Sequence, residues 1–337
     1  MIIRMRKTVI KVLRPGMGEI AYAHEWGDKY LFVTDASLET YDWLVAYDEV
    51  PHKSWGRLHG GKERLACPAS RTILVTAEPP SIKLYSPAYL AQFGYVLTTH
   101  PPEIIRHPGY RLGRGCLSWF YNRSYDAFIQ QNQFPKTEDV SVVCSSKAMT
   151  HTSHNDRLNL VRELARELPN LQWFGHGVRP IGDKAEALEA FRYHLAIENH
   201  MAPHHWTEKL ADAFLAACLP FYAGDPAIFE IFPEESLIPI PLDDPARAAN
   251  LIRQAIENNE YEKRLPAILE ARRLVLTRYN FWAQVAATIE AHKPSAFEER
   301  TEKACICSRH RLRRNPLHLA SEAVDIMRCR RLRLSQR

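Results

Sequence analysis

The sequence of 337 residues has no long apolar run. No stretch approaches the roughly 18 apolar residues that a membrane-spanning helix needs. The first ten residues, MIIRMRKTVI, lack the apolar core of a signal peptide. We therefore expect the folded part of the chain to stay in the cytoplasm. With 46% hydrophobic and 25% charged residues, the composition is that of a globular protein, so disorder is not the default.

The sequence also lacks a cysteine pattern that would stabilise it covalently or hold a metal. Its seven cysteines are an odd number at scattered spacings, which argues against a disulfide framework and indicates mostly reduced thiols. Near the C-terminus, the spacing of Cys305, Cys307, His310 and Cys329 fits none of the common zinc patterns. A further group of histidines on predicted loops is interpreted as hydrogen-bonding or acceptor-contacting residues and not as metal ligands. These are His151, His154, His200, His204 and His205.

Two nucleotide-binding loops are missing as well. Neither half of the chain contains G-x-G-x-x-G or a Walker lysine loop, and Gly175-His176-Gly177 is too short to replace either. The absence argues against a dehydrogenase and against a P-loop enzyme.

Charge is distributed unevenly along the chain. Ten Lys or Arg and two acidic residues give residues 303–337 a charge of +8; the whole chain carries +5, so residues 1–302 carry −3. Between two arginine clusters the apolar residues recur at near-helical spacing: Leu319, Ala320, Ala323, Val324, Met327 and Leu334. Two interpretations stay open, a basic amphipathic segment on an anionic membrane surface and a disordered, solvated tail. A nucleic-acid partner is disfavoured, because no aromatic residue follows Phe297 and the body is mildly acidic.

Alternating strand and helix patterns predict an α/β fold. Short apolar runs between turn residues predict strands at 9–13, 30–33, 43–47, 72–76 and 94–98. The second half predicts strands at 140–144, 171–174, 193–197 and 219–222, with helices at 156–168, 184–191, 208–217, 246–257 and 281–291. Such alternation implies a parallel, doubly wound sheet whose ligand crevice lies at the carboxyl ends of the strands.

We divide the chain accordingly into four parts. Residues 1–135 form an N-terminal acceptor-side α/β domain, and 136–275 a C-terminal nucleotide-sugar domain. A helix within 276–302 returns to the first domain, and 303–337 form the basic tail. The polar segment 125–139 is the expected linker.

Polar residues gather where one predicted strand leads into a predicted helix. Glu198 and Asn199 follow the strand, and Thr207 then stands as an N-cap before Glu208 and Lys209. At a helix start the first backbone N–H groups are unpaired and the dipole is positive, so an anion is stabilised. Lys209 adds a mobile positive charge. The pattern is typical of a diphosphate site, and the alternative is a solvated helix terminus.

Three short motifs follow one another in this region. They are YHLAIEN at 193–199, TEKL at 207–210 and LPFYAG at 219–224. In this order and spacing they resemble the donor-binding signature of the fucosyltransferases of glycosyltransferase family 10, in its bacterial type. The family pattern is Y-x-F-x-L-x-F-E-N, T-E-K-[LI] and V/I-P-[VI]-x-x-G, and the first motif here is a looser version, with Ile where Phe is usual. The resemblance covers roughly the second half of the chain. It implies that a GDP-sugar is bound by Glu198, Asn199, Thr207, Glu208 and Lys209.

Two upstream segments fall in family order. Arg157, near the start of the helix expected from 156, matches an arginine that contacts the donor pyrophosphate in the family. The segment 77–81, AEPPS, resembles the family's E-S-P or G-E-N segment, whose glutamate is the proposed catalytic base. The resemblance therefore assigns that role to Glu78. The match is incomplete, because His204-His205-Trp206 stand where some bacterial relatives have a tyrosine.

The resemblance implies a GT-B architecture, with two Rossmann-like domains facing an interdomain cleft, and an inverting transfer. Arg157, Lys209 and the helix start at Thr207 would stabilise the departing diphosphate, with Glu208 on the ribose hydroxyls. Glu78 would take the proton of the acceptor hydroxyl. No metal cofactor is expected, since the sequence has no D-x-D pair; Asp243-Asp244 lies in a Pro-flanked loop.

These residues lead to one main hypothesis and two alternatives. The main hypothesis is a metal-independent fucosyltransferase that uses GDP-fucose. Its expected acceptor is an N-acetylglucosamine or glucose unit of a glycoconjugate or lipopolysaccharide, reached from the cytoplasm or the inner face of the cytoplasmic membrane. The alternatives are a GT-B glycosyltransferase with another GDP-sugar, and a non-catalytic protein that binds sugar nucleotides or glycans.

Overall fold

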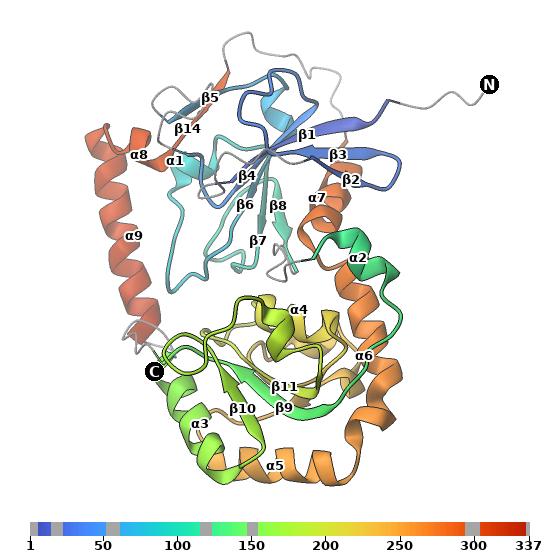
Figure 1. Cartoon of the computed structure of the whole chain (residues 1–337). Coiled ribbons are helices and arrows are strands. Elements are labelled where there is room, and N and C mark those ends of the chain that lie inside the picture. Colours follow the sequence, from blue (N-terminus) through green and yellow to red (C-terminus); the bar gives the residue numbers. More distant parts are fainter. Residues whose placement is uncertain are drawn as a thin grey trace, which may run out of the picture. The chain divides into compact units, whose positions relative to one another are not determined.

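The computed structural model describes residues 6–14, 23–51, 61–114, 123–146, 154–293 and 304–334. Contacts divide the chain into two compact units (Figure 1). Unit 1 combines Met1–Cys116 with Phe281–Arg337, and unit 2 is Leu117–Asn280. The first boundary therefore falls earlier than the one expected after residue 135, and the last part of the chain belongs to unit 1.

Unit 1 is built on a seven-stranded sheet in which all neighbouring strands run parallel except the β2–β3 hairpin. Its central strands are almost wholly buried, as expected for a parallel sheet covered on both faces. In spatial order the strands are β2 (Ala23–Trp26), β3 (Tyr30–Val33), β1 (Thr8–Leu13), β4 (Trp43–Tyr47), β6 (Thr72–Val75), β7 (Tyr95–Thr98) and β8 (Tyr110–Leu112).

The remaining elements of unit 1 come from both ends of the chain. Helix α7 (Phe281–Glu290) places the ring of Phe281 against those of Phe32 and Tyr47, with centroids 6.1 and 5.8 Å away. The other elements are η1 (Ala69–Arg71), α1 (Pro87–Leu90), β5 (Lys62–Arg64), β14 (Cys305–Cys307), α8 (Arg309–Leu312) and α9 (Pro316–Leu334).

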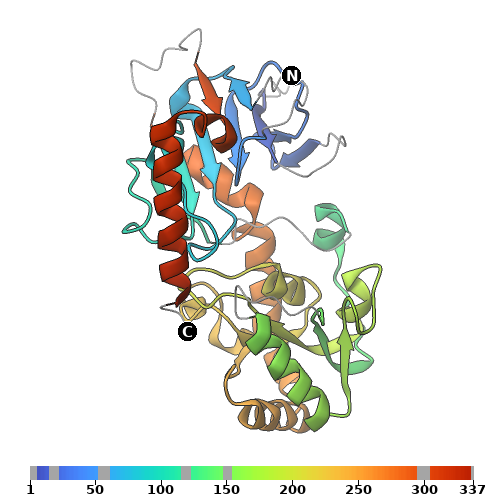
Figure 2. The ribbon, with the colours of Figure 1, turned by 90° about the vertical axis from the view of Figure 1, so that its left-hand side faces the viewer.

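The basic C-terminal segment is built into unit 1. Strand β14 pairs antiparallel with β5, and Ile306 is 1% exposed within the core of the unit. Strand β5 is fixed in turn by a buried ion pair between Glu63 and Lys11 of β1, 2.8 Å long. Helix α9, dark red in Figure 2, follows α8, and its Glu322 accepts hydrogen bonds from Arg309 and Arg313. The described part of this segment is therefore folded and largely helical, which argues against a disordered tail, and its place on a membrane surface stays a prediction.

Unit 2 contains a five-stranded sheet in which every neighbouring pair is parallel. The strands, in spatial order, are β10 (Leu171–Phe174), β9 (Glu138–Val143), β11 (Phe191–Ile197), β12 (Leu219–Ala223) and β13 (Ile238–Pro239). The helices are α2 (Tyr125–Gln130), α3 (His154–Glu167), α4 (Glu208–Leu215), α5 (Pro245–Glu257) and α6 (Glu260–Thr277), with 3₁₀ turns η2 (Lys184–Ala187), η3 (Ile228–Glu230) and η4 (Glu234–Ser236).

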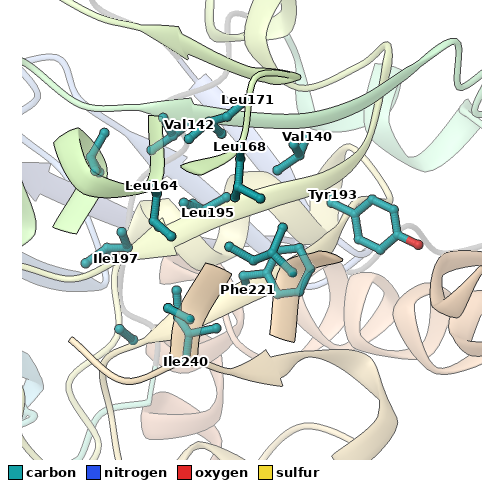
Figure 3. Close-up of a cluster of buried hydrophobic side chains, with 14 of the residues drawn as sticks. Val140, Val142, Leu164, Leu168, Leu171, Tyr193, Leu195, Ile197, Phe221 and Ile240 are labelled. Atoms are coloured by element: carbon teal, nitrogen blue, oxygen red, sulfur yellow. The ribbon is translucent and has the colours of Figure 1, made fainter. Parts of the chain in front are cut away.

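Helices cover both faces of this sheet. Because side chains alternate along a strand, Tyr193, Leu195 and Ile197 of β11 face the core formed with α3 and α5 (Figure 3). Ala196 belongs to a second core, formed with α4 and the C-terminal half of α6. The expected fold class is thus confirmed: both units are Rossmann-like α/β structures, as in the GT-B fold.

The strand order fixes where unit 2 can bind a ligand. Numbered along the chain, the order β10-β9-β11-β12-β13 reads 2-1-3-4-5. The chain winds in opposite directions on the two sides of β9 and β11, so a crevice opens between the carboxyl ends of these two strands. Ligands of open α/β sheets bind at this topological switch point.

Two expectations about unit 2 are wrong. The helix predicted at 184–191 is the short turn η2, capped by Asp183, and β11 already begins at Phe191, which pairs with Glu138 of β9. The segment expected as a linker contains α2, whose Phe128 is fully buried against the second core. A single apolar anchor within a polar stretch was too weak a sequence signal for this helix.

Candidate functional site

A cavity of about 260 Å³ lies at the switch point of unit 2. Its walls come from the end of β9, the first turns of α3 and α4, the turn η2 and strand β11. Four of the predicted donor-binding residues line it: Arg157, Asn199, Glu208 and Lys209. Glu198 and Thr207 lie directly behind this wall and act on it through hydrogen bonds.

Glu198 and Thr207 fix the start of α4 against the end of β11. Thr207 is the N-cap, and its hydroxyl oxygen accepts from the backbone N–H of Lys209. Glu198, fully buried, accepts from the backbone N–H of Thr207 at 2.7 Å and from its hydroxyl at 2.5 Å. Two backbone N–H groups at this helix start are thereby satisfied. Glu198 and Thr207 thus position the wall of the cavity, and the remaining side chains of the turn face the ligand space.

The end of the third motif is explained by the same packing. A Cβ atom on Gly224 would lie 2.7 Å from Cγ of Glu198 and 2.2 Å from the hydroxyl of Tyr222. Both distances are shorter than real Cβ contacts, so only glycine lets the Glu198 side chain pass this close to the backbone. Gly224 therefore supports the helix cap indirectly, because it leaves room for the Glu198 side chain that binds Thr207.

Lys209 is one of the cations that line the cavity. Its Nζ lies 3.0 Å from Glu208 Oε1 and 3.5 Å from Glu198 Oε2. Burial lowers the pKa of Lys209, the two carboxylates raise it, and the net shift is upward, so the ammonium stays charged. For Glu208, burial raises the pKa, Lys209 and Lys184 lower it, and the net shift is downward. The cavity wall thus presents a charged ammonium beside an ionised carboxylate.

Arg157 adds a second cation from the other side of the switch point. It stands in the first turns of α3, which follows β9, and is 8% exposed. Its Nη1 donates to Oδ1 of Asn199, 2.9 Å away, while its Nε has no hydrogen-bond partner among the described residues. Asn199 follows β11, so this bond joins the two strands of the crevice.

The cavity lining also includes charged residues that were not predicted from the sequence. Lys184 of η2 and Asp212 of α4 form an ion pair of 2.6 Å, and Asp212 is 2% exposed. His194 of β11 lies beside them, with its Nδ1 2.8 Å from the hydroxyl of Ser141. Burial and the charges of Lys184 and Lys136 lower the pKa of His194 to about 3, which keeps the ring neutral. A signal existed in the sequence, because Asp212 interrupts an otherwise apolar stretch of α4.

Glu78, the predicted base, belongs to unit 1. It lies three residues beyond β6, on the carboxyl side of the sheet, and is exposed. The backbone there is fixed from β7: Nε2 of the buried His100 donates to the Glu78 carbonyl oxygen at 2.8 Å. The side chain is thus carried by a segment held between two strands of unit 1.

The described residues contain no group of three or more His, Cys, Asp or Glu side chains arranged to hold a metal ion. Of the five histidines expected near the site, His200 and His205 meet edge to face, with ring centroids 5.3 Å apart. His204 has a positive φ of 64° and donates its backbone N–H to Asp225. His151 lies outside the described residues, and His154 begins α3.

Helix α9 presents an apolar surface to the outside. Glu322, Asp325 and Cys329, at helical spacing on one face, are buried against unit 1. Outside this face Leu319, Val324 and Met327 are about half exposed, at 53%, 49% and 55%. This is the reverse of the usual arrangement, in which the apolar face of a surface helix faces the core. In the part of the chain that is described, no helix is both long enough and apolar enough to cross a membrane.

Several solved structures are similar to this chain. A crystal structure of an alpha1,3-fucosyltransferase has 15% sequence identity and a TM-score of 0.48, over 84% of this chain and 89% of that protein. A structure of alpha1,3-fucosyltransferase with GDP-fucose has 14% identity and a TM-score of 0.44, over 81% and 91%. A glycosyltransferase from Rickettsia africae ESF-5 has 9% identity and a TM-score of 0.43, over 74% and 76%. No protein-family model matches the sequence.

Proposed function

We propose that this protein is an inverting, metal-independent fucosyltransferase. It takes fucose from GDP-fucose and transfers it to a hydroxyl of an N-acetylglucosamine or glucose unit in a glycoconjugate or lipopolysaccharide. The observation that carries the proposal is the convergence of Arg157, Asn199, Glu208 and Lys209 on one cavity at the switch point of unit 2. They come from three parts of the chain, α3, the end of β11 and the start of α4, and match the motifs and the upstream arginine that resemble the family 10 signature.

The cations Arg157 and Lys209 of the cavity lining suit a departing diphosphate. Negative charge grows on the diphosphate as its bond to the sugar breaks, and a fixed guanidinium and ammonium stabilise that charge in place of a divalent metal. Arg157 is already oriented by Asn199, and Lys209 stands in the first turn of α4, where the helix dipole is positive. The carboxylate of Glu208, beside Lys209, offers acceptors for the ribose hydroxyls.

Glu78 supplies the base in this proposal. The acceptor O–H gives its proton to the Glu78 carboxylate, and the oxygen forms a bond to the anomeric carbon. The bond from that carbon to the diphosphate breaks, and GDP leaves with the electron pair. Attack from the face opposite the leaving group inverts the anomeric centre. Such general-base assistance contributes about 10² to 10⁴ in rate.

The decisive experiment measures GDP release. Purified protein is incubated with GDP-fucose or with GDP-mannose, each with a panel of saccharides that end in N-acetyllactosamine, N-acetylglucosamine or glucose. We expect acceptor-dependent release from GDP-fucose only. Release from GDP-mannose alone would replace fucose by another sugar and keep the enzyme class. Binding of GDP without turnover of either donor on any acceptor would contradict a transferase and favour a binding protein.

We further propose that the protein works peripherally on the inner face of the cytoplasmic membrane through α9. Two features of the helix support this: the exposed apolar residues Leu319, Val324 and Met327, and the run of arginines near its C-terminal end. An apolar surface beside basic side chains fits an anionic lipid surface, with about 1 kcal/mol for each basic residue near the lipid. The proposal accounts for the polar side of α9 facing the protein.

A further inference from the structure

The unit 2 cavity is lined by two chemically different sets of residues. One set is the cations Arg157 and Lys209. The other set is apolar side chains, among them Val143 and Leu188, together with the ion pair of Lys184 with the buried Asp212. A nucleoside diphosphate has the same polarity along its length, with anionic phosphates at one end and a flat base with a polar edge at the other.

Asp212 has an acceptor that none of the described residues uses. The side chain is 2% exposed and lines the cavity, and Lys184 Nζ lies 2.6 Å from Oδ2. The other oxygen, Oδ1, has no hydrogen-bond partner among the described residues. A buried acceptor without a partner costs about 1–3 kcal/mol, so a group that is retained in this state indicates a missing donor. A ligand that brings an N–H group into the cavity would supply that donor.

The position of Asp212 along α4 agrees with this assignment. Asp212 follows Glu208 by one helical turn, so both residues face the same cavity from the same side of the helix. We place the ribose and the diphosphate at Glu208 and Lys209, and Asp212 lies one turn, about 5.4 Å, further along α4. The base of a bound nucleotide would therefore reach Asp212.

We propose that Asp212 and Lys184 read the guanine base of the donor, and so select GDP over other nucleoside diphosphates. This inference rests on the proposed function. The Watson–Crick edge of guanine presents an acceptor, O6, followed by two donors, N1–H and the amino group N2. The ammonium of Lys184 and the carboxylate of Asp212 offer the complementary sequence of one donor and two acceptor oxygens.

Other bases lack this pattern. Adenine presents an acceptor at N1, which would face the Asp212 carboxylate, and uracil has one N–H between two acceptors. Hypoxanthine keeps O6 and N1–H but has no amino group. A site built to satisfy a buried polar group rejects analogues that leave the group unpaired. Inosine diphosphate (IDP) carries hypoxanthine as its base. The ratio of the GDP and IDP affinities therefore measures the contact to the amino group alone.

The test is calorimetric binding of GDP, IDP, ADP and UDP to the full chain and to Asp212→Asn. We expect the unchanged protein to bind GDP about 10- to 100-fold more tightly than IDP, the range for one hydrogen bond to a charged group, and to bind ADP and UDP more weakly still. In Asp212→Asn the GDP-to-IDP ratio should fall to within about threefold, since an amide oxygen accepts less strongly than a carboxylate.

Asp225→Asn is the matched control. Asp225 is another buried aspartate of unit 2 with an oxygen that lacks a partner among the described residues, but it does not line the cavity. Its variant should keep the full GDP-to-IDP ratio. If Asp212→Asn fails to fold, Lys184→Met tests the same pair, and we expect it to weaken GDP and IDP equally, because both carry O6.

The outcomes separate this inference from the proposed function. If GDP, IDP, ADP and UDP bind equally well, the proposal that Asp212 recognises the base is wrong, although the cavity still binds a nucleoside diphosphate. If Asp212→Asn retains the full preference for GDP over IDP, the amino group is read elsewhere. If none of the four nucleotides binds the unchanged protein, the assignment of the donor site fails as a whole.

Discussion

Arg157 and Asn199 are joined by a hydrogen bond of 2.9 Å, from Nη1 to Oδ1, although they lie 42 positions apart. One follows β9 and the other follows β11, so the bond spans the switch point of unit 2. The buried Nε of Arg157 has no hydrogen-bond partner among the described residues. The guanidinium is therefore oriented before a ligand arrives, which reduces the entropy lost when an anion binds.

Replacing Arg157 by alanine should weaken the binding of GDP by about 10- to 100-fold, because one charge-assisted contact to the diphosphate is lost. Calorimetry measures the affinity. Arg157→Lys should recover only part of it, since a lysine keeps the charge but not the planar geometry of the guanidinium. The control is Arg166→Ala on the same helix, whose exposed side chain pairs with Glu163. Equal losses in Arg157→Ala and Arg166→Ala would contradict a specific contact.

The elements that carry Asn199, Glu208 and Lys209 were predicted well because their sequence signals are local. An apolar run predicted β11, and the N-cap Thr207 predicted the start of α4 at Glu208, as observed. The pairing of Lys184 with Asp212 could not be predicted in this way. Lys184 was expected in a helix, and only the fold shows that η2 brings it to Asp212, 28 positions away. Ion pairs between distant segments leave no periodic pattern in a sequence.

Two further elements also depend on tertiary contacts that local sequence patterns do not reveal. Helix α6 has 18 residues, but Pro266 inside it interrupts the sequence pattern, and the helix persists because residues such as Ala271 and Val275 pack into the second core of unit 2. In α9, Glu322 and Asp325 face the protein, contrary to the expectation for charged side chains. The buried Glu322 is compensated by Arg309 and Arg313, whose positions follow from tertiary structure alone, whereas Asp325 lies 3.8 Å from Arg328 of the same helix.

Glu78→Gln should lower kcat for fucose transfer by about 10²- to 10⁴-fold, the range for the loss of a general base. The amide is nearly isosteric with the carboxylate but cannot take the proton of the acceptor. GDP affinity should stay unchanged, because Glu78 belongs to unit 1 and the donor cavity to unit 2. Glu103→Gln, at another exposed position of unit 1, is the control. Unchanged turnover in Glu78→Gln would remove this residue from the mechanism.

The preference for GDP over IDP should depend on pH. Burial raises the pKa of Asp212 to about 6, against the opposing charge of Lys184. Below that pH the free protein carries a protonated Asp212, so GDP must displace a proton in order to bind to the carboxylate. The GDP-to-IDP affinity ratio should therefore be largest above pH 7 and fall as the pH is lowered from about 6 to 5.

The other charged groups near Asp212 do not obscure this measurement. Lys184, Glu208 and Lys209 contribute to its environment, and His194 stays neutral because its pKa is about 3. IDP carries the same diphosphate as GDP, so the titration of the phosphate cancels in the ratio. Asp212→Asn should show a ratio that does not change with pH. A ratio that is constant from pH 7.5 to 5 in the unchanged protein would contradict a carboxylate in contact with the base.

Membrane binding through α9 is testable without removing the helix. Deleting residues 303–337 would also remove β14 and the buried Ile306, so loss of binding in that variant would only report damage to unit 1. The double variant Leu319→Ser, Met327→Ser changes two exposed side chains and leaves the buried face of α9 intact. We expect it to lose sedimentation with vesicles of phosphatidylcholine and phosphatidylserine, because its apolar surface is reduced, and to keep its activity on a free saccharide.

Leu269→Ser is the matched control, since Leu269 is an exposed leucine of α6 in unit 2. It should sediment like the unchanged protein. The electrostatic part of membrane binding is measured by varying the salt concentration and the lipid composition of the vesicles. Because the arginines of α9 are attracted to anionic lipid, binding should weaken as the salt concentration rises and should be weak on vesicles of phosphatidylcholine alone. Equal sedimentation of the double variant and the unchanged protein would exclude α9 as the membrane surface, and insensitivity to salt would exclude its arginines.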